Sequence, residues 1–239
     1  MPRDPNTAAR TLVVVPALNE SESLPATLAK LKREAPQVDV LVIDDGSRDG
    51  TAEVARAHGV PVVRHAFNLG VGAALQTAFR YALEHGYDVA VQFDADGQHD
   101  AGDLAAIVAP VVAGTCDVAI GSRYVTTTGY RAPLTRRLGM LLFSGLVRLA
   151  VGQRIADTTS GFRAYGRAAM EVCQYDFPRD FPDAPLLIML ARRGFRLQEV
   201  PAHMHERVAG KSFYTLGKSL YYPYKNLLAS LMALLQRPR

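Results

Sequence analysis

The sequence lacks the features that mark several protein classes. Among 239 residues there are two cysteines, Cys116 and Cys173, which stand apart without metal-site spacing, so we expect reduced thiols and no disulfide framework. The longest apolar run, LGMLLFSGLVRLAVG, contains Arg148 and is shorter than the ~20 residues that a membrane span needs. The early segment VVVP is too short for the apolar part of a signal peptide. We therefore do not expect a secreted or an integral membrane protein.

The chain also shows no internal repeat and no low-complexity linker. Hydrophobic residues make up 49% and charged residues 21%, which is an ordinary globular balance. This length can form one domain with a small appendage. We expect a flexible N-terminus over residues 1–10, a main domain over 11–214 and a C-terminal amphipathic helix over 215–239.

Charge is unevenly distributed along the chain. Residues 123–167 hold eight arginines against one acid, a net charge of +7, and residues 203–239 carry +5, so the remainder carries −8 of the total +4. Such asymmetry indicates a basic surface facing phosphate, nucleic acid or lipid headgroups, although a solvated charged face would look the same. No series of stacking aromatic residues accompanies the basic segments, so we expect no nucleic-acid partner.

Short apolar runs alternate with helical patterns. The runs TLVVVP, VDVLVIDD, VPVVRH, DVAVQFDAD and CDVAIGSR indicate buried strands, and helices are expected near 20–34, 50–58, 70–86 and 101–113. This order predicts an α/β fold, with a mostly parallel central sheet and helices on both faces. Ligands bind such sheets at the carboxyl ends of the strands, where this chain places Asn19, Glu20, Asp44, Asp45, Asn68, Asp94, Asp96, Ser122 and Arg123.

Asp94 and Asp96 stand two residues apart, followed by Gly97 and Gln98. Oxygen ligands of this kind suit Mg²⁺ or Mn²⁺, but Asp and Gly are also favoured turn residues, so a cation site and a plain turn both remain open. An EF-hand fits poorly, because positions 99 and 105 lack the required Gly and Glu.

The segment VIDDGSRDGT joins a strand to a helix. Asp49 is a candidate N-cap and Gly46 permits a turn. Because capping would satisfy at most one of Asp44 and Asp45, we interpret this pair as candidate acceptors for a nucleobase or a ribose. The nearby string NLGVGAA has Leu75 in place of the third glycine of a dinucleotide-binding loop, so a Rossmann dehydrogenase is not expected.

Two further groups lie near the C-terminus. His203 and His205 alternate along an expected strand, but a zinc site there would lack an obvious third ligand. Arg207 and Lys211, in ERVAGKS, form a glycine-containing basic loop that could bind a diphosphate or be a solvated turn.

Together these strings resemble glycosyltransferase family two, which has the GT-A fold, and in particular its polyprenyl-phosphate-mannose (dolichol-phosphate-mannose) synthase branch. The strings VVVPALNE, VIDDGSRDGT, FNLGVGAALQTAF, QFDADGQHD, GSRY, DTTSGFRAY and RVAGKS stand in the family's order over about residues 11–215. The resemblance implies transfer of a hexose, mannose from GDP-mannose in the branch, to a polyprenyl phosphate. UDP-glucose as donor remains an alternative, as does a non-catalytic module that binds sugar nucleotides.

The resemblance also implies roles for particular residues. Contacts to the nucleotide sugar are implied for Pro16, Ala17, Asn19, Glu20, Asp44, Asp45, Asn68, Gly72, Asp94, Ala95, Asp96, Gln98 and Arg123. Binding of Mg²⁺ or Mn²⁺ is implied for Asp94, Asp96 and Gln98, and binding of the acceptor phosphate for Arg136, Ser144 and Arg163. The candidate catalytic residues are Asp96, Arg207, Lys211 and Asp183.

The need for a catalytic base depends on the acceptor. The family's reaction inverts the anomeric carbon, and a sugar hydroxyl as attacking group would need a carboxylate base. A phosphate monoester, with a second pKa near ~6, is largely dianionic at neutral pH and needs none. Asp183 could be such a base or the N-cap of a helix over 184–193, and we expect the cap.

A polyprenyl acceptor would place the protein at a membrane. Residues 134–152 combine a broad apolar face with arginines, as an interfacial helix does, although a core helix with snorkelling arginines has the same pattern. We expect a cytoplasmic protein that binds peripherally to the inner face of the membrane, with or without a separate membrane protein partner.

Overall fold

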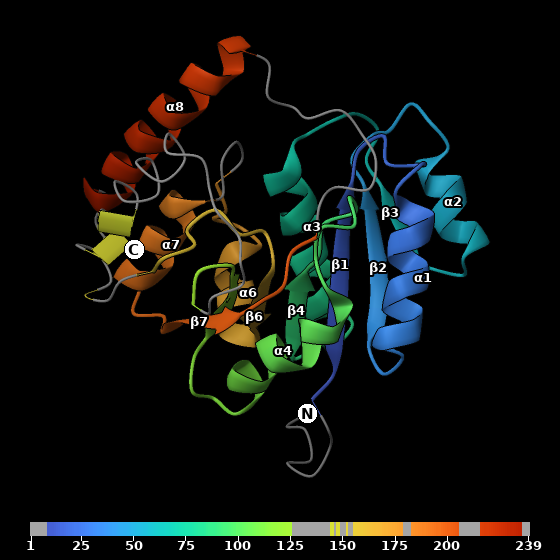
Figure 1. Cartoon of the computed structure of the whole chain (residues 1–239), viewed down its shortest axis with the longest axis horizontal. Coiled ribbons are helices and arrows are strands. Elements are labelled where there is room, and N and C mark those ends of the chain that lie inside the picture. The colour runs from blue at the N-terminus through green and yellow to red at the C-terminus, as the bar shows by residue number, and fades with distance from the viewer. Residues whose placement is uncertain are drawn as a thin grey trace.

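The computed structural model describes residues 9–125, 144, 145, 147, 148, 152, 155–178, 183–205 and 216–235, the last segment with side chains from Lys225 onward. The elements, shown in Figure 1, are β1 (Thr11–Ala17), α1 (Leu24–Glu34), β2 (Asp39–Asp44), α2 (Thr51–Ala57), β3 (Val62–Arg64), α3 (Val71–Glu84), β4 (Val89–Gln92), η1 (Ala101–Asp103), α4 (Leu104–Val112), β5 (Val118–Ser122), β6 (Arg163–Gly166), α6 (Arg167–Cys173), α7 (Ala184–Arg192), β7 (Leu197–Pro201) and α8 (Leu216–Leu235).

The described strands form one seven-stranded sheet in the order β3-β2-β1-β4-β6-β5-β7. Strand β6 is antiparallel to its neighbours β4 and β5, and the other pairs are parallel. Because β1, β2, β4 and β5 run in the same direction, their carboxyl ends meet at one edge, at the top of Figure 1. The loops with the predicted site residues therefore leave the sheet on the same side.

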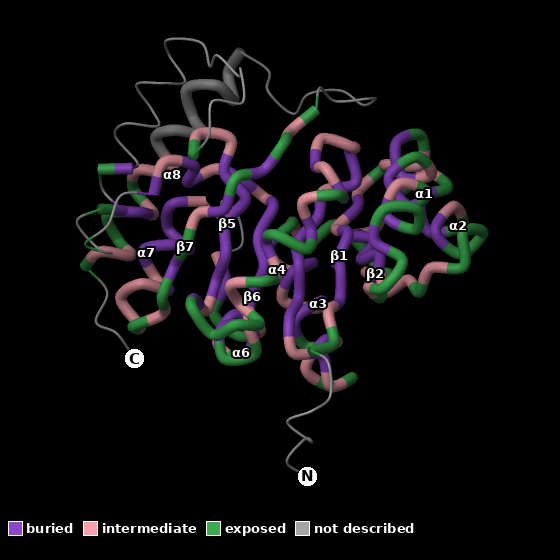
Figure 2. Tube along the Cα trace, turned by 60° about the horizontal axis from the view of Figure 1, so that its bottom comes forward, coloured by how far each residue is buried: buried purple, intermediate pink, exposed green. Residues whose placement is uncertain are grey.

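Helices cover both faces of the sheet, and β1 shows why. Its continuous apolar run sends Leu12 and Val14 into a core formed with α3, α6 and α7. The alternate residues Val13 and Val15 enter a second core, formed with α1, α2 and α4. The buried trace along the middle strands in Figure 2 corresponds to these two cores. The predicted α/β architecture is confirmed.

Near the C-terminus the structure corrects one expectation. Strand β7 ends at Pro201, so His203 and His205 do not lie on a strand, and beyond it Met204 forms an isolated bridge with His99. Helix α8 spans Leu216–Leu235. In the part of the chain that the structure describes, no helix is both long and apolar enough to cross a bilayer.

Most of the helix expected over 134–152 lies outside the described residues. The four described positions before Gly152 are helical; Ser144 and Val147 are buried, whereas Arg148 is exposed. Whether this segment lies at a membrane interface stays a prediction.

Candidate active site

The loops after β1 and β2 are joined by hydrogen bonds between main chain and side chains. Asn19, which has a positive φ of 55°, donates its N–H to Ser47 Oγ at 2.9 Å, and its Oδ1 accepts from the N–H of Arg48 at 2.8 Å. The N–H of Glu20 binds Thr51 Oγ1 at 2.9 Å. These contacts hold Asn19 and Glu20, in the predicted nucleotide-binding segment 16–20, against the loop after β2.

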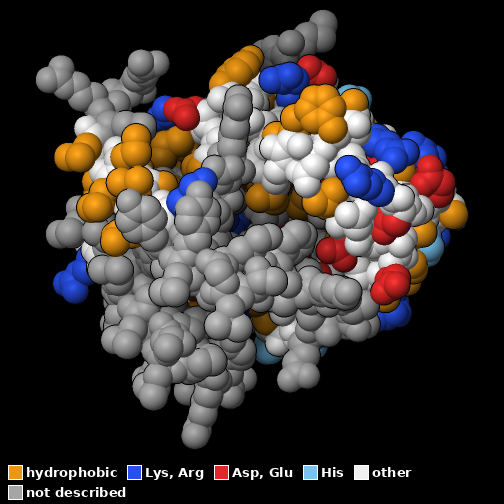
Figure 3. Space-filling model, turned by 90° about the horizontal axis from the view of Figure 1, so that it is seen from above, with side chains coloured by type: hydrophobic (Ala, Val, Ile, Leu, Met, Phe, Trp, Pro, Cys, Tyr) orange, Lys and Arg blue, Asp and Glu red, His pale blue; other side chains and the backbone are white. Residues whose placement is uncertain are grey.

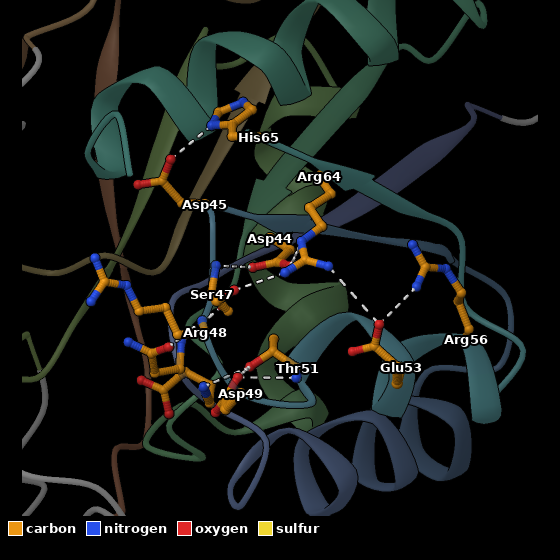
Figure 4. Close-up of polar contacts among 12 residues, drawn as sticks. Asp44, Asp45, Ser47, Arg48, Asp49, Thr51, Glu53, Arg56, Arg64 and His65 are labelled. Atoms are coloured by element: carbon orange, nitrogen blue, oxygen red, sulfur yellow. Dashed lines mark hydrogen bonds and ion pairs between the residues drawn. The ribbon is translucent and has the colours of Figure 1, made fainter. Parts of the chain in front are cut away.

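Asp44 is buried and has local partners for both carboxylate oxygens. Oδ1 accepts from the N–H of Ser47 at 2.9 Å, and Oδ2 lies 3.0 Å from Arg64 Nε. Figure 4 shows the Arg64 guanidinium lying over this carboxylate. Asp44 therefore orders the turn that follows β2.

Asp45 points away from Asp44, toward the start of α3 (Figure 4). It accepts from the N–H groups of Leu69 at 3.0 Å and Gly70 at 2.8 Å, and His65 Nδ1 lies 2.7 Å from its Oδ1. Both aspartates therefore have partners within the protein, beyond what helix capping alone would supply. Their contacts to a nucleotide stay a prediction.

Asp94 and Asp96 follow β4 at the same edge. The Asp94 side chain is 37% exposed, and His99 Nε2 lies 3.1 Å from its Oδ2. Burial alone would raise its pKa, but the nearby His99, Gln92 and Arg163 outweigh that effect and hold the pKa of Asp94 below its ordinary value. Asp94 is therefore ionised throughout the neutral range.

Asp96 is almost completely buried, at 7% exposure, and its Oδ1 accepts from the N–H of Gln98 at 3.0 Å. Gly97 has a φ of 78°, so the chain turns tightly between the two residues. The predicted turn and the predicted cation site are thus compatible, because the turn leaves the Asp94 carboxylate partly open.

Two histidines that follow β7 contact aspartates just after the acidic motif of Asp94 and Asp96. His203 Nδ1 lies 3.1 Å from Asp103 Oδ1, and His205 Nε2 lies 2.7 Å from Asp100 Oδ2. Each histidine has its own aspartate, and in the described ranges no group of three or more His, Cys, Asp or Glu could hold a metal ion. A zinc pair at 203 and 205 is not supported.

Arg123 forms a bidentate ion pair instead of extending freely toward a donor. Its Nε and Nη2 lie 2.7 Å from the two oxygens of Asp157, and Nη2 also donates to Thr159 Oγ1 at 2.9 Å. Asp157 is in turn held through its own N–H by Glu199 at 2.8 Å. The geometry gives Arg123 a role in ordering the loop before β6.

Asp183 stands at the N-cap position of α7, as expected, but its side chain makes no capping hydrogen bond there. The carboxylate Oδ2 instead accepts from Asn226 Nδ2 of α8 at 3.2 Å. Burial raises the pKa of Asp183 to about 6, with Asp157 and Asp94 adding to the effect and Arg163 and Asn226 opposing it. The charges of two other predicted site residues, Arg163 and Asp94, therefore influence the pKa of Asp183.

The remaining predictions divide by location. Arg163 is fully buried and donates from Nη2 to Thr158 O at 3.0 Å, and Ser144 is also buried. Arg136, Arg207 and Lys211 lie outside the described residues. Pro16, Ala17, Asn68, Gly72 and Ala95 lie in the loops or element ends at the same edge of the sheet.

Sequence reasoning missed His99, Gly161 and Asn226. His99 directly follows the acidic motif, but one histidine forms no pattern. Gly161 approaches Asp94 so closely that a Cβ there would lie 2.8 Å from its Oδ2. Asn226 lies 43 residues from its partner, Asp183, so no local spacing could have revealed it.

Residues 12–173 match the model of the family described as "Glycosyl transferase family 2". The chain belongs to glycosyl transferase family 2. It is a glycosyltransferase with the GT-A fold, as its motifs predicted.

Two relatives align with most of this glycosyltransferase. It is 37% identical over 217 residues to "Undecaprenyl-phosphate mannosyltransferase" of Micrococcus luteus, covering 85% of this chain and 86% of the relative. It is 37% identical over 221 residues to "Polyprenol monophosphomannose synthase" of Mycolicibacterium smegmatis, covering 85% and 80%. The resemblance to the polyprenyl-phosphate branch is confirmed.

A solved structure supports the fold of this glycosyltransferase. Glucosyl-3-phosphoglycerate synthase from Mycobacterium tuberculosis, in complex with Mn²⁺, uridine diphosphate and phosphoglyceric acid, matches with a TM-score of 0.68 at 19% identity. The match covers 97% of this chain and 80% of that one.

Proposed function

We propose that this glycosyltransferase is an inverting, metal-dependent enzyme that transfers mannose from GDP-mannose to a polyprenyl phosphate at the membrane surface. The observation that carries the proposal is the position of Asp94 and Asp96 at the carboxyl end of β4. The 37% identity to relatives named for polyprenyl-phosphate mannosylation supports this donor sugar and this acceptor.

The residues after β4 fit a divalent cation by their chemistry. They offer an ionised carboxylate at Asp94, a second at Asp96 and the amide oxygen of Gln98, all of which are hard oxygen donors. Mg²⁺ is commonly held by one or two carboxylates and completed by substrate phosphates, so a third acidic ligand is not required. When bound, Mg²⁺ or Mn²⁺ would neutralise charge on the departing nucleotide diphosphate. We propose that Arg207 and Lys211 contact the same diphosphate.

The chain's own residues would position the acceptor. A phosphate dianion needs orientation more than deprotonation. Arg163 has a buried guanidinium whose charge lowers the pKa values of Asp94 and Asp183, and Ser144 has a buried hydroxyl with no hydrogen bond among the described residues. We propose that these two groups, with Arg136, bind the acceptor phosphate.

A lipid acceptor requires the enzyme to work at a membrane surface, and we propose peripheral binding at the cytoplasmic face. Figure 3 looks onto the carboxyl edge of the sheet, where charged side chains gather on the side of α1 and α2 and hydrophobic ones on the side of α8. Among the side chains of α8 that the structure describes, from Lys225 onward, the exposed apolar ones are Leu228, Leu231, Met232 and Leu235. Retention on anionic liposomes that falls in the variant with Arg137→Glu and Arg148→Glu would support this placement, and unchanged retention would contradict it.

A second candidate function is transfer to a sugar hydroxyl with Asp183 as the base. It is favoured by the absence of a side-chain cap and by the raised pKa of Asp183, about 6, which suits proton abstraction near neutral pH. Asp183→Asn separates the two functions. Transfer to polyprenyl phosphate should persist in this variant, whereas transfer to a hydroxyl should fall about 10²–10⁴-fold.

The test of the proposed function is a panel of GDP- and UDP-sugars with a short polyprenyl phosphate and either Mg²⁺ or Mn²⁺, with products measured by mass. We expect mannosyl phosphate polyprenol from GDP-mannose. Product from UDP-glucose instead would identify UDP-glucose as the donor. Binding of a sugar nucleotide without product from any combination of donor and metal would indicate a non-catalytic module.

A further inference from the structure

His99 occupies an aromatic site beneath the acidic motif. Its ring stacks on Phe162, with centroids 4.9 Å apart and planes 24° apart, and meets the edge of Phe93 at 5.4 Å. The residue is 2% exposed, and the isolated bridge with Met204 fixes its backbone. The ring position is therefore set by packing on two sides.

This surrounding would suit a phenylalanine better than a histidine. Nδ1 has no hydrogen-bond partner among the described residues, and Nε2 faces the Asp94 carboxylate. Burying such groups without partners costs free energy that an apolar ring of similar shape would not cost. Aromatic packing does not account for a ring that carries nitrogens at this position. The neighbouring carboxylate does, because His99 Nε2 lies 3.1 Å from Asp94 Oδ2.

Asp94 is confined from a second direction. A Cβ at Gly161 would lie 2.8 Å from Asp94 Oδ2 and 3.1 Å from Oδ1, so the main chain of Gly161 lies directly against the carboxylate. The same Cβ would lie 3.1 Å from Gln92 Nε2. His99 and Gly161 together restrict where the Asp94 oxygens can lie.

We propose that His99 is a positioning residue that holds the Asp94 carboxylate in the orientation needed for the divalent cation, without contacting the cation or the donor. The inference rests on the proposed function, because it assumes that Asp94 is a metal ligand. Partners of metal-binding groups commonly contribute 10–100-fold to metal affinity, and we expect an effect of about this size at His99.

The test measures binding of Mn²⁺ to the purified chain in the presence of GDP, from the electron paramagnetic resonance signal of free Mn²⁺. His99→Phe keeps the aromatic packing and removes the nitrogens. We expect it to weaken Mn²⁺ binding by about 10–100-fold with little change in melting temperature. His203→Phe is the matched control, because it breaks a His–Asp pair with Asp103 and should change the affinity less than about threefold.

Two conservative variants keep the test decisive if His99→Phe does not fold. Glutamine can place an amide nitrogen near the position of Nε2, whereas asparagine reaches only the position of Nδ1. His99→Gln should therefore bind Mn²⁺ several-fold more tightly than His99→Asn. Equal affinities of these two, or equal affinities of wild type and His99→Phe, would overturn the proposal.

A double-mutant comparison separates this inference from the proposed function. In an Asp94→Asn background, adding His99→Phe should have no further effect, because the histidine acts through the carboxylate. If His99→Phe weakened Mn²⁺ binding in the Asp94→Asn background as much as it does in wild type, the positioning role would be contradicted. If Asp94→Asn alone bound Mn²⁺ as tightly as wild type, the metal assignment itself would fail, and the inference with it.

Discussion

Asn226 of α8 donates a hydrogen bond to Asp183 at the start of α7, with 3.2 Å between Nδ2 and Oδ2. The contact connects the C-terminal helix to a carboxylate whose charge is influenced by Arg163, Asp157 and Asp94. The C-terminal helix therefore helps to set the charge of a residue at the candidate active site.

Asp183→Asn should stabilise the protein at neutral pH. The folded-state pKa of Asp183, about 6, lies above the ordinary value of 3.8, so folding is favoured by protonation and the ionised carboxylate lowers stability as the pH rises through 4 to 6. Removing the charge should raise the free energy of unfolding at pH 7.5 by about 1–3 kcal/mol. Urea unfolding at several pH values measures this, and the gain should vanish near pH 4. A gain that is the same at pH 4 and pH 7.5 would exclude this cause.

Gly46→Ala should destabilise the loop after β2 more than its backbone conformation alone requires. A Cβ at Gly46, where φ is 76°, would lie 2.5 Å from the carbonyl carbon of Phe67. Gly59 has a similar φ of 72° with nothing within 4 Å of its Cβ, so Gly59→Ala costs only the conformational term of about 1–2 kcal/mol. We expect thermal unfolding to show a clearly larger loss for Gly46→Ala, and equal losses would show that Phe67 can move away at no cost.

Arg123→Ala should reduce stability by about 3–5 kcal/mol, because it leaves the charge of Asp157 buried without its partner. Adding Asp157→Asn should restore part of that loss, which a direct role in donor binding would not predict. Denaturant unfolding of the two single variants and the double variant measures the coupling. Purely additive losses would contradict a scaffold role for Arg123.

Gly161→Ala should weaken binding of the cation and of the donor together, because the new methyl group would collide with the Asp94 carboxylate. We expect at least about a tenfold rise in the Mn²⁺ concentration needed for half-maximal GDP binding, by the same reasoning as for other groups that position a ligand. Gly50→Ala is the control, since nothing lies within 4 Å of its Cβ. Unchanged Mn²⁺ dependence in Gly161→Ala would show that Asp94 need not be held rigidly.

Much of the fold could be predicted from the sequence because its central parallel strands are largely buried on both faces. In β1 the run LVVV is apolar without interruption, and both of its faces meet helices. Strand β6 was missed because it is only four residues long and begins with a charged residue, Arg163. This arginine is 1% exposed, although its type predicts an exposed position. Because arginine is not apolar, a buried arginine does not contribute to the hydrophobic pattern by which a buried strand is predicted.

The candidate site was predicted by position but not by orientation. Residue type placed Asp44, Asp45, Asp94 and Asp96 at the strand ends, where the structure has them. It could not show that Asp44 and Asp45 point apart to separate local partners, or that Asp183 turns from its helix toward Asn226. Such choices depend on contacts made by residues distant in the chain.

The central claim is that the acidic residues after β4 bind the cation that activates the donor, and transfer of labelled mannose from GDP-mannose to polyprenyl phosphate tests it most directly. We expect wild type to form product with Mg²⁺ or Mn²⁺ and to lose activity with a chelator. Asp96→Ala, with an unchanged melting temperature, should form at least about 100-fold less product, in line with the loss of an electrostatic group at a reacting centre. Full transfer by Asp96→Ala, or by wild type without divalent cations, would contradict the account.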